Sequence, residues 1–196
     1  MTELSRRDAV QLMAGIPLLA AGLSPRTITR AVESARAAQA AAAPFTPAWF
    51  TAHEYQTVRL LADYIIPKDA RSGSATDAGV PEFMDFILND QKNMQTPMRG
   101  GLAWLDTECR ERFNQSFLLA SDAQRRQVLD DIAWPAKARP ALSQGVSFFS
   151  DFRDLTASGF FSSKMGVEDL QYLGNTIVME WNGCPPEALK KLGVNY

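Results

Sequence analysis

The sequence predicts an all-α protein, a single compact multi-helix domain of orthogonal or bundle-like form, preceded by a twin-arginine signal segment. Three observations support this fold class. Apolar residues recur at helical spacing along the chain. Two capping boxes mark helix starts. No stretch alternates apolar and polar residues between turn signals, as a half-buried strand would. The length of 196 residues suits one domain with a proper core and hardly suffices for two.

The N-terminal segment, residues 1–43, is predicted to be an export signal with its cleavage region. It carries the adjacent pair Arg6 and Arg7, followed by an apolar run over residues 14–23. A bilayer span needs about 20 apolar residues, so this run is too short for a membrane helix. A charged segment, a short apolar segment and then small residues are typical of a secretory signal. The paired arginines resemble a twin-arginine signal, although two neighbouring positions depart from its usual pattern.

Small residues near the end of this segment offer several Ala-x-Ala cleavage sites, including residues 38–40 and 40–42. The helical domain is therefore expected to cover residues 44–196. Two alternatives remain open for the N-terminal segment. It could be an uncleaved anchor, or an ordinary cytosolic amphipathic helix that begins with a chance Arg-Arg pair.

Helix signals follow one another along the domain. A first helix is predicted from the capping box of Thr51 and Glu54 to Pro67, which stops it. A loop rich in Gly, Ser and Asp follows over residues 68–79. Pro81 then lies in the first turn of a second helix. The expected buried stripe of that helix is Phe83, Phe86 and Ile87.

Further helices complete the predicted domain. The longest runs from about Thr96 to Phe113, with one apolar face. A second capping box, Ser121-x-x-Gln124, opens a helix that ends before Pro135. Residues 143–155 form another amphipathic helix, and residues 166–172 could form a short one.

The composition excludes several classes of function. Lys and Arg number 20 against 22 Asp and Glu, for a net charge of −2, so no nucleic-acid partner is expected. One histidine and two cysteines cannot build a zinc finger, an all-cysteine iron–sulfur site or a Cys-x-x-Cys-His haem attachment. The chain also lacks the glycine-rich motifs that hold dinucleotides or phosphates. We therefore predict no catalytic residue, cofactor site or metal site on this chain.

His53 is the one side chain of the sequence with an unperturbed pKa near neutral pH, and it lies in a predicted first helical turn beside Glu54. A general base needs an orienting group and a reacting group within reach. No serine or cysteine stands in a recognised nucleophile setting, so a partly exposed structural histidine is the favoured interpretation. A stand-alone periplasmic enzyme that uses His53 and nearby carboxylates is one alternative function, and a cytosolic helical adaptor is the other.

Cys109 and Cys184 are the two cysteines, and they lie far apart in the sequence. In an oxidising compartment they are candidates for a disulfide that closes a long loop and stabilises the domain by about 2–4 kcal/mol. Two independent buried thiols are the alternative.

Aromatic residues gather in two segments that are not predicted to be helical. Phe160 and Phe161 lie in a predicted turn rich in Gly and Ser, and the tail carries Trp181 and Tyr196. Aromatic side chains displayed on such segments can anchor a protein–protein interface. We therefore treat these four residues as candidates for partner contact, with plugging of the ends of a helical core as the alternative.

Several blocks of the chain, taken together and in this order, resemble the gluconate 2-dehydrogenase subunit 3 family. They are the export signal, FTPAWFTAHEYQTVRLLADYIIP at residues 45–67, AGVPEF at 78–83, LAWLD at 102–106, the glycine- and phenylalanine-containing segment 156–166, and WNGC at 181–184. The resemblance covers nearly the whole domain.

The resemblance implies a non-catalytic small subunit of a periplasmic FAD-dependent sugar, polyol or glucoside dehydrogenase. FAD and the catalytic residues are then expected on a large subunit that resembles the glucose–methanol–choline oxidoreductases. A cytochrome c subunit with haem often passes the electrons to the membrane. The twin-arginine translocase would export the folded pair to the periplasm, with this chain as escort and stabiliser of the large subunit. The resemblance carries over no catalytic residue.

Overall fold

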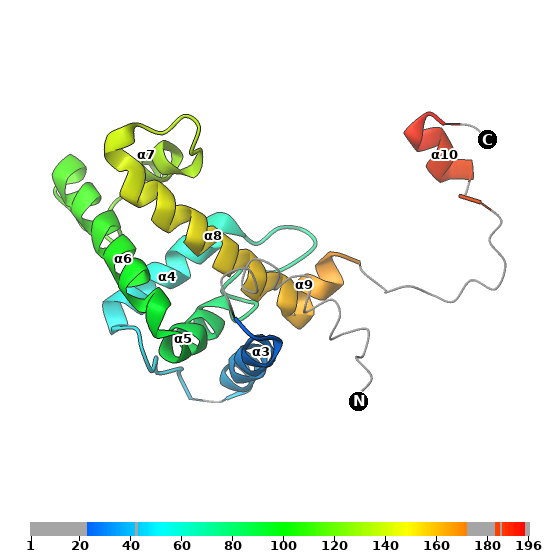
Figure 1. Cartoon of the computed structure of the whole chain (residues 1–196), viewed down its shortest axis with the longest axis horizontal. Coiled ribbons are helices and arrows are strands. Elements are labelled where there is room, and N and C mark those ends of the chain that lie inside the picture. Colours follow the sequence, from blue (N-terminus) through cyan, green and yellow to red (C-terminus); the bar gives the residue numbers. More distant parts are fainter. Residues whose placement is uncertain (1–22, 42, 172–182, 185, 195–196) are drawn as a thin grey trace.

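The computed structural model describes residues 23–41, 43–171, 183–184 and 186–194. Within these ranges the chain forms helices and loops and no strands, which confirms the all-α prediction (Figure 1). The elements in chain order are α3 (Pro25–Ala40), α4 (Ala52–Ile65), α5 (Val80–Asp90), α6 (Lys92–Phe113), α7 (Asp122–Ala133), the 3₁₀ turn η1 (Pro140–Leu142), α8 (Ser143–Ser162), α9 (Lys164–Asp169) and α10 (Pro186–Leu192).

The long helix α8 is the centre of the domain. It contacts α4, α5, α6, α7 and α9, and it crosses the middle of the view in Figure 1. Its residues Phe152, Leu155 and Phe160 are at most 1% exposed. The core therefore forms around α8, with the other helices packed on its sides.

Both capping boxes predicted from the sequence are present. The Thr51 hydroxyl accepts from the backbone N–H of Glu54 at 3.2 Å, while a Glu54 carboxylate oxygen accepts from the Thr51 N–H at 2.8 Å. Ser121 and Gln124 make the same reciprocal pair at the start of α7. These contacts satisfy backbone donors that the first turn of a helix leaves without partners.

Helix α5 positions the segment that leads into α4. The buried carboxylate of Asp85 accepts from the backbone N–H groups of Ala48, Trp49 and Phe50 at 2.8, 3.0 and 3.1 Å. Three donors on one carboxylate fix the path of this irregular segment, because each buried N–H needs an acceptor. The position of His53, a few residues later, follows from this anchor.

Two glycines let α6 and α8 approach closely. A Cβ on Gly101 would lie 1.8 Å from the Phe148 ring, and a Cβ on Gly145 would lie 2.4 Å from the Trp104 ring. Each glycine therefore receives an aromatic ring from the opposite helix. This arrangement explains why glycine is tolerated inside two helices where it costs about 1 kcal/mol relative to alanine.

The structure corrects the predicted bounds of two helices. α6 begins at Lys92 rather than near Thr96, directly after α5. Pro97 removes one backbone hydrogen bond from its second turn. The Gln95 side chain ties this turn to the end of α5 by donating to the Leu88 carbonyl at 2.7 Å.

The predicted turn around Phe160 and Phe161 is wrong, because α8 continues to Ser162. Gly159 allows helix contact here, since a Cβ at this position would lie 2.9 Å from the Phe83 ring of α5. The chain turns only at Ser163, which caps α9 by accepting from the Gly166 N–H at 3.0 Å. Small residues in this segment thus serve packing between helices rather than a loop.

Helix α3, Pro25–Ala40, lies within the segment predicted to be the export signal and its cleavage region, and it packs on α5. Helix α10 follows the undescribed segment 172–182 and buries no residue. Among the helices that the structure describes, none is both long enough and apolar enough to cross a membrane.

Candidate functional site

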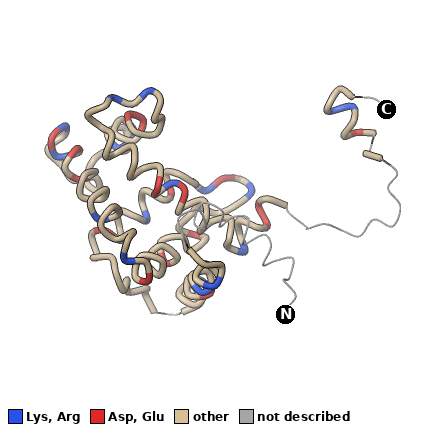
Figure 2. Tube along the Cα trace, in the orientation of Figure 1, with Lys and Arg blue, Asp and Glu red and all other residues tan. Residues whose placement is uncertain are grey.

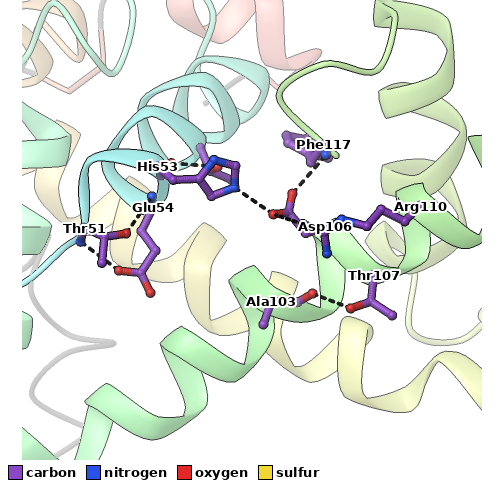
Figure 3. Close-up of polar contacts among 9 residues, drawn as sticks. Thr51, His53, Glu54, Ala103, Asp106, Thr107, Arg110 and Phe117 are labelled. Atoms are coloured by element: carbon purple, nitrogen blue, oxygen red, sulfur yellow. Dashed lines mark hydrogen bonds and ion pairs between the residues drawn. The ribbon is translucent and has the colours of Figure 1, made fainter. Parts of the chain in front are cut away.

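The most distinctive polar cluster joins the first turn of α4 to the middle of α6. His53 Nε2 lies 2.7 Å from Asp106 Oδ2, and the two residues are 53 positions apart in the sequence. Figure 3 shows the imidazole pointing from α4 toward the carboxylate on α6. The His53 side chain is 50% exposed and that of Asp106 is 9% exposed. One partner therefore faces solvent while the other lies within the fold.

Asp106 has further partners besides His53. Its Oδ1 accepts from the backbone N–H of Phe117 at 3.0 Å, and its Oδ2 also accepts from Arg110 Nη2 at 3.2 Å. The Phe117 contact fixes the loop that follows α6 (Figure 3). These bonds favour the charged carboxylate and hold it in place. Asp106 is thus a junction among α4, α6 and the loop before α7.

A cavity of about 300 Å³ lies beside this pair, between α4 and α6. Its ionisable lining residues are His53, Glu54, Arg99, Asp106 and Arg110. Arg99 Nε donates to Glu54 Oε1 at 2.9 Å, and the guanidinium lies 4.4 Å from the centre of the Trp49 ring. The charges around the cavity are therefore mostly paired with one another.

The pKa of the Glu54 carboxyl is set by a balance between burial and hydrogen bonds. Burial disfavours its charged form and would raise the pKa, but hydrogen bonds from Thr51 and Arg99 outweigh burial and lower the pKa below its ordinary value. Glu54 is therefore a carboxylate near neutral pH. It acts as a cap and an ion-pair partner rather than as a proton donor.

The hydroxyls of the cavity do not point toward the imidazole as nucleophiles would. Thr57 donates its hydroxyl to the His53 carbonyl at 3.0 Å, and Thr107 donates to the Ala103 carbonyl at 2.9 Å. A nucleophile needs a hydrogen bond to its base. The His53–Asp106 pair can hold or move a proton, but the hydrogen bonds around it are those of a structural cluster.

A second cavity, of about 240 Å³, lies where α3 meets the start of α5 and the α8–α9 corner. Arg36 and Gln39 line it from α3, and Lys164 and Glu168 line it from α9. Gln39 Nε2 donates to the Asp77 carbonyl at 2.7 Å, which closes one side. In the described part of the chain, no three His, Cys, Asp or Glu side chains gather in a way that could hold a metal ion.

Lys, Arg, Asp and Glu are interspersed along the helices (Figure 2). The most exposed large apolar side chains in these ranges are Leu119 at 75%, Leu192 at 71% and Trp134 at 64%. The sequence alone did not single them out, because an exposed apolar residue cannot be told from a buried one without the fold.

The candidate interface aromatics have different environments. Phe160 is 1% exposed and packs in the core, while Phe161 is partly buried against it; their rings meet edge to face at 5.2 Å. Phe160 therefore presents almost no surface to a partner, because it lies on the inner side of α8. Trp181 and Tyr196 lie outside the described residues.

The predicted disulfide stays a prediction. Cys109 is fully buried on α6, and burial raises the pKa of its thiol to about 11. Cys184 lies beyond the undescribed segment 172–182. Arg6 and Arg7, which were predicted to belong to an export signal, also lie outside the described residues.

A comparison of the sequence with models of known protein families identifies its family. The model described as gluconate 2-dehydrogenase subunit 3 matches residues 52–180, from the first residue of α4 to beyond α9. This chain belongs to the gluconate 2-dehydrogenase subunit 3 family. The resemblance inferred from the sequence is thereby confirmed, and the family name places the chain in a dehydrogenase complex with a larger partner. Searches of the curated proteins and of the solved structures find no significant match.

The family match includes the His53–Asp106 cluster and excludes α3. The sequence pattern indicated His53 but not its neighbours Asp106 and Arg99. One signal for Asp106 was available: it is an acidic residue next to Leu102, Leu105 and Cys109 on an otherwise apolar helix face. A charged residue there must find partners when the face is buried.

Proposed function

We propose that this chain is the non-catalytic small subunit of an exported FAD-dependent dehydrogenase that oxidises a sugar, polyol or glucoside. In this proposal the flavin and the reacting groups reside on a larger subunit of the glucose–methanol–choline type, with a cytochrome c subunit as a further electron carrier. The family match over residues 52–180 is the observation that carries the proposal.

The first role proposed for the chain is to supply the export address. Arg6 and Arg7 precede a short apolar run, in the order typical of a twin-arginine signal. That route exports folded proteins, so a partner bound in the cytoplasm would travel with the chain to the periplasm. The helical domain provides a folded surface on which such a partner can be carried.

The second proposed role is stabilisation of the large subunit. A protein that binds the folded state of its partner, and not the unfolded state, shifts the folding equilibrium of that partner by mass action. Expression of the large subunit without this chain should therefore leave it in the cytoplasm, or degraded. Full periplasmic activity of the large subunit alone would contradict both roles.

The export role has a direct test in the twin arginines. The double variant Arg6→Lys, Arg7→Lys should abolish export of both subunits, because the translocase recognises the arginine pair. The matched control is Arg26→Lys with Arg30→Lys, two exposed arginines of α3. Immunoblots of periplasmic and cytoplasmic fractions measure the outcome, and unchanged export of the first variant would refute the twin-arginine assignment.

A second candidate function is supported by one observation, the His53–Asp106 pair beside a cavity of about 300 Å³. A histidine oriented by a carboxylate is a common general base, and such groups contribute about 10²–10⁴-fold to rates. The variant His53→Gln in the assembled complex separates the two functions. If this chain has no catalytic role, the complex that carries His53→Gln keeps the kcat of the wild-type complex. A loss of kcat of about 10²-fold or more would place His53 in catalysis.

A further inference from the structure

Helix α3 has the features of a domain helix rather than of a cleaved leader. Ser24 caps it by accepting from the Thr27 N–H at 3.2 Å, and Pro25 stands at its first position. Its buried face consists of Ile28, Ala31, Val32 and Ala35, at 2, 0, 4 and 6% exposed. Leu23, just before the cap, is 3% exposed. The helix therefore has its own start signal and a complete buried face.

Helix α3 contacts α5 and the turn before it near both of its ends. The Arg30 guanidinium lies 5.7 Å from the centre of the Phe86 ring on α5. At the other end, Gln39 Nε2 donates to the Asp77 carbonyl at 2.7 Å. These two contacts show that α3 runs along α5 in the opposite direction, with α3 and α5 side by side (Figure 1).

The turn before α5 fits the end of α3 closely. Gly79 has a φ of 81°, and a Cβ there would lie 2.9 Å from Gln39 Cδ. A left-handed backbone favours glycine by itself, and the nearby α3 side chain adds a steric reason. The family-matched domain thus carries, at residues 77–79, a surface that is complementary to a helix outside the match.

Removal of α3 would uncover the apolar side of α5. Seven of the eleven α5 residues are buried in the full structure, including Val80, Phe83 and Met84 at 0–1% exposed. A helix buried to this extent needs cover on more than one side. Cleavage at residues 38–42, which the alanine-rich sequence suggests, would take away one of its covers.

We infer that α3 is the first helix of the mature protein and that signal processing leaves residues 23–41 on the chain. The inference rests on the proposed export. Ala20 and Gly22 offer small residues two positions apart, directly before Leu23 and at the end of the apolar run, where a signal-peptidase site is expected. The alanine-rich stretch at 37–43 is then the end of a helix and the connection to the family-matched domain.

The test is the N-terminal sequence of the protein isolated from the periplasm of its native host as part of its complex. The first residue should lie at or before Leu23, so that α3 is intact. Any first residue beyond Leu23 overturns the inference. Immunoblots of the same fractions report export separately, so a failure of export is distinguished from a wrong processing boundary.

A pair of full-length variants tests separately whether α3 packs as part of the domain, a condition that the inference requires and that does not depend on export. Ala31→Gln places a longer polar side chain in a fully buried position of α3, whereas Ala37→Gln makes the same change at an exposed position of that helix. If α3 belongs to the domain, Ala31→Gln lowers the Tm by roughly 4–8 °C. Ala37→Gln should leave it almost unchanged. Equal Tm values for the two variants would overturn the inference.

Discussion

At the scale of single residues, two buried carboxylates position the segments around the candidate site. Asp85 accepts from three consecutive backbone N–H groups and fixes the approach to α4. Asp106 accepts from Phe117 and Arg110, forms a hydrogen bond with His53, and so joins two helices to a loop. Both side chains lie within the fold, so each contact replaces water that these groups would otherwise bind.

Loss of the Asp106 carboxylate should destabilise the domain. Asp106→Ala leaves the buried Phe117 N–H without its acceptor, which costs about 1–3 kcal/mol in the free energy of unfolding. Urea unfolding of the full-length variant measures this. Asp130→Ala, at an exposed position of α7, is the control and should change the same quantity by less than about 0.5 kcal/mol. Equal effects of the two substitutions would show that Asp106 has no anchoring role.

At the scale of elements, the two glycines at positions 100 and 101 of α6 differ sharply in their surroundings. Gly101 faces the Phe148 ring, whereas a Cβ on Gly100 would project into open space, with no neighbouring atom within 4 Å. Gly100→Ala should therefore raise the free energy of unfolding by about 0.5–1 kcal/mol through helix propensity. Gly101→Ala should lower it by about 1–3 kcal/mol, because α8 must move.

Urea unfolding of both glycine variants compares them within one helix turn. Opposite signs are the expected result. The same sign in both variants would mean that the close approach of α6 and α8 does not exist in solution.

The start of α4 should show a pH dependence that comes from Glu54. Its pKa in the folded state lies below the ordinary value of 4.5, so its charge stabilises the fold above about pH 4.5, and this contribution is lost as the pH falls through the folded pKa. Glu54→Gln keeps the capping box and removes the charge. The variant should be less stable than the wild type by about 0.5–1 kcal/mol at neutral pH.

Urea unfolding of Glu54→Gln at neutral and acid pH checks the sign. The stability difference from wild type should disappear at acid pH, where Glu54 is protonated in both states. Glu33→Gln, on the exposed side of α3, is the matched control and should show no such dependence. A difference that persists in acid would assign the effect to lost packing instead of charge.

Features that depend on residues within one helical turn were predictable from the sequence. Features that depend on a contact with another helix were not. The capping boxes at Thr51 and Ser121 lie within one helical turn, so the pattern shows them directly. The end of α8 was not predictable in this way. Gly159 and its small neighbours match a turn as well as a helix contact, and only the position of Phe83 on α5 distinguishes the two.

The candidate site was likewise only partly predictable, because its two main residues lie on different helices. His53 is conspicuous as the one histidine of the sequence, but its partner Asp106 is 53 residues away and belongs to another helix. No short motif links the two. Likewise, α3 carries apolar residues at helical spacing, yet its place beside alanine-rich cleavage motifs favoured a leader.

At the scale of the whole molecule, the fold is a helical domain built around α8, with a polar junction at α4 and α6 and an additional helix, α3, on α5. The family match gives this domain a larger dehydrogenase partner. We propose that the chemistry belongs to that partner, and that this chain provides export and stabilisation.

The proposed stabilisation of the partner can be tested only in the assembled complex. The Tm of the large subunit should rise when this chain is bound, by an amount that grows with the concentration of free chain relative to its Kd. A thermal melt of the flavoprotein, followed by flavin fluorescence with and without added full-length chain, measures the shift. A Tm that does not depend on the chain would remove the stabilising role and leave export as the remaining function.

The central claim is that the redox chemistry belongs to another subunit. Purification of this chain, tagged at its C-terminus, from the periplasm of its native host tests it most directly, with mass spectrometry of the co-purified proteins and a visible spectrum before and after the subunits are separated. We expect a larger flavoprotein in equal amount, and a flavin spectrum and dehydrogenase activity that stay with that flavoprotein. A chain that purifies alone, carries flavin and oxidises a sugar with an artificial electron acceptor would contradict it.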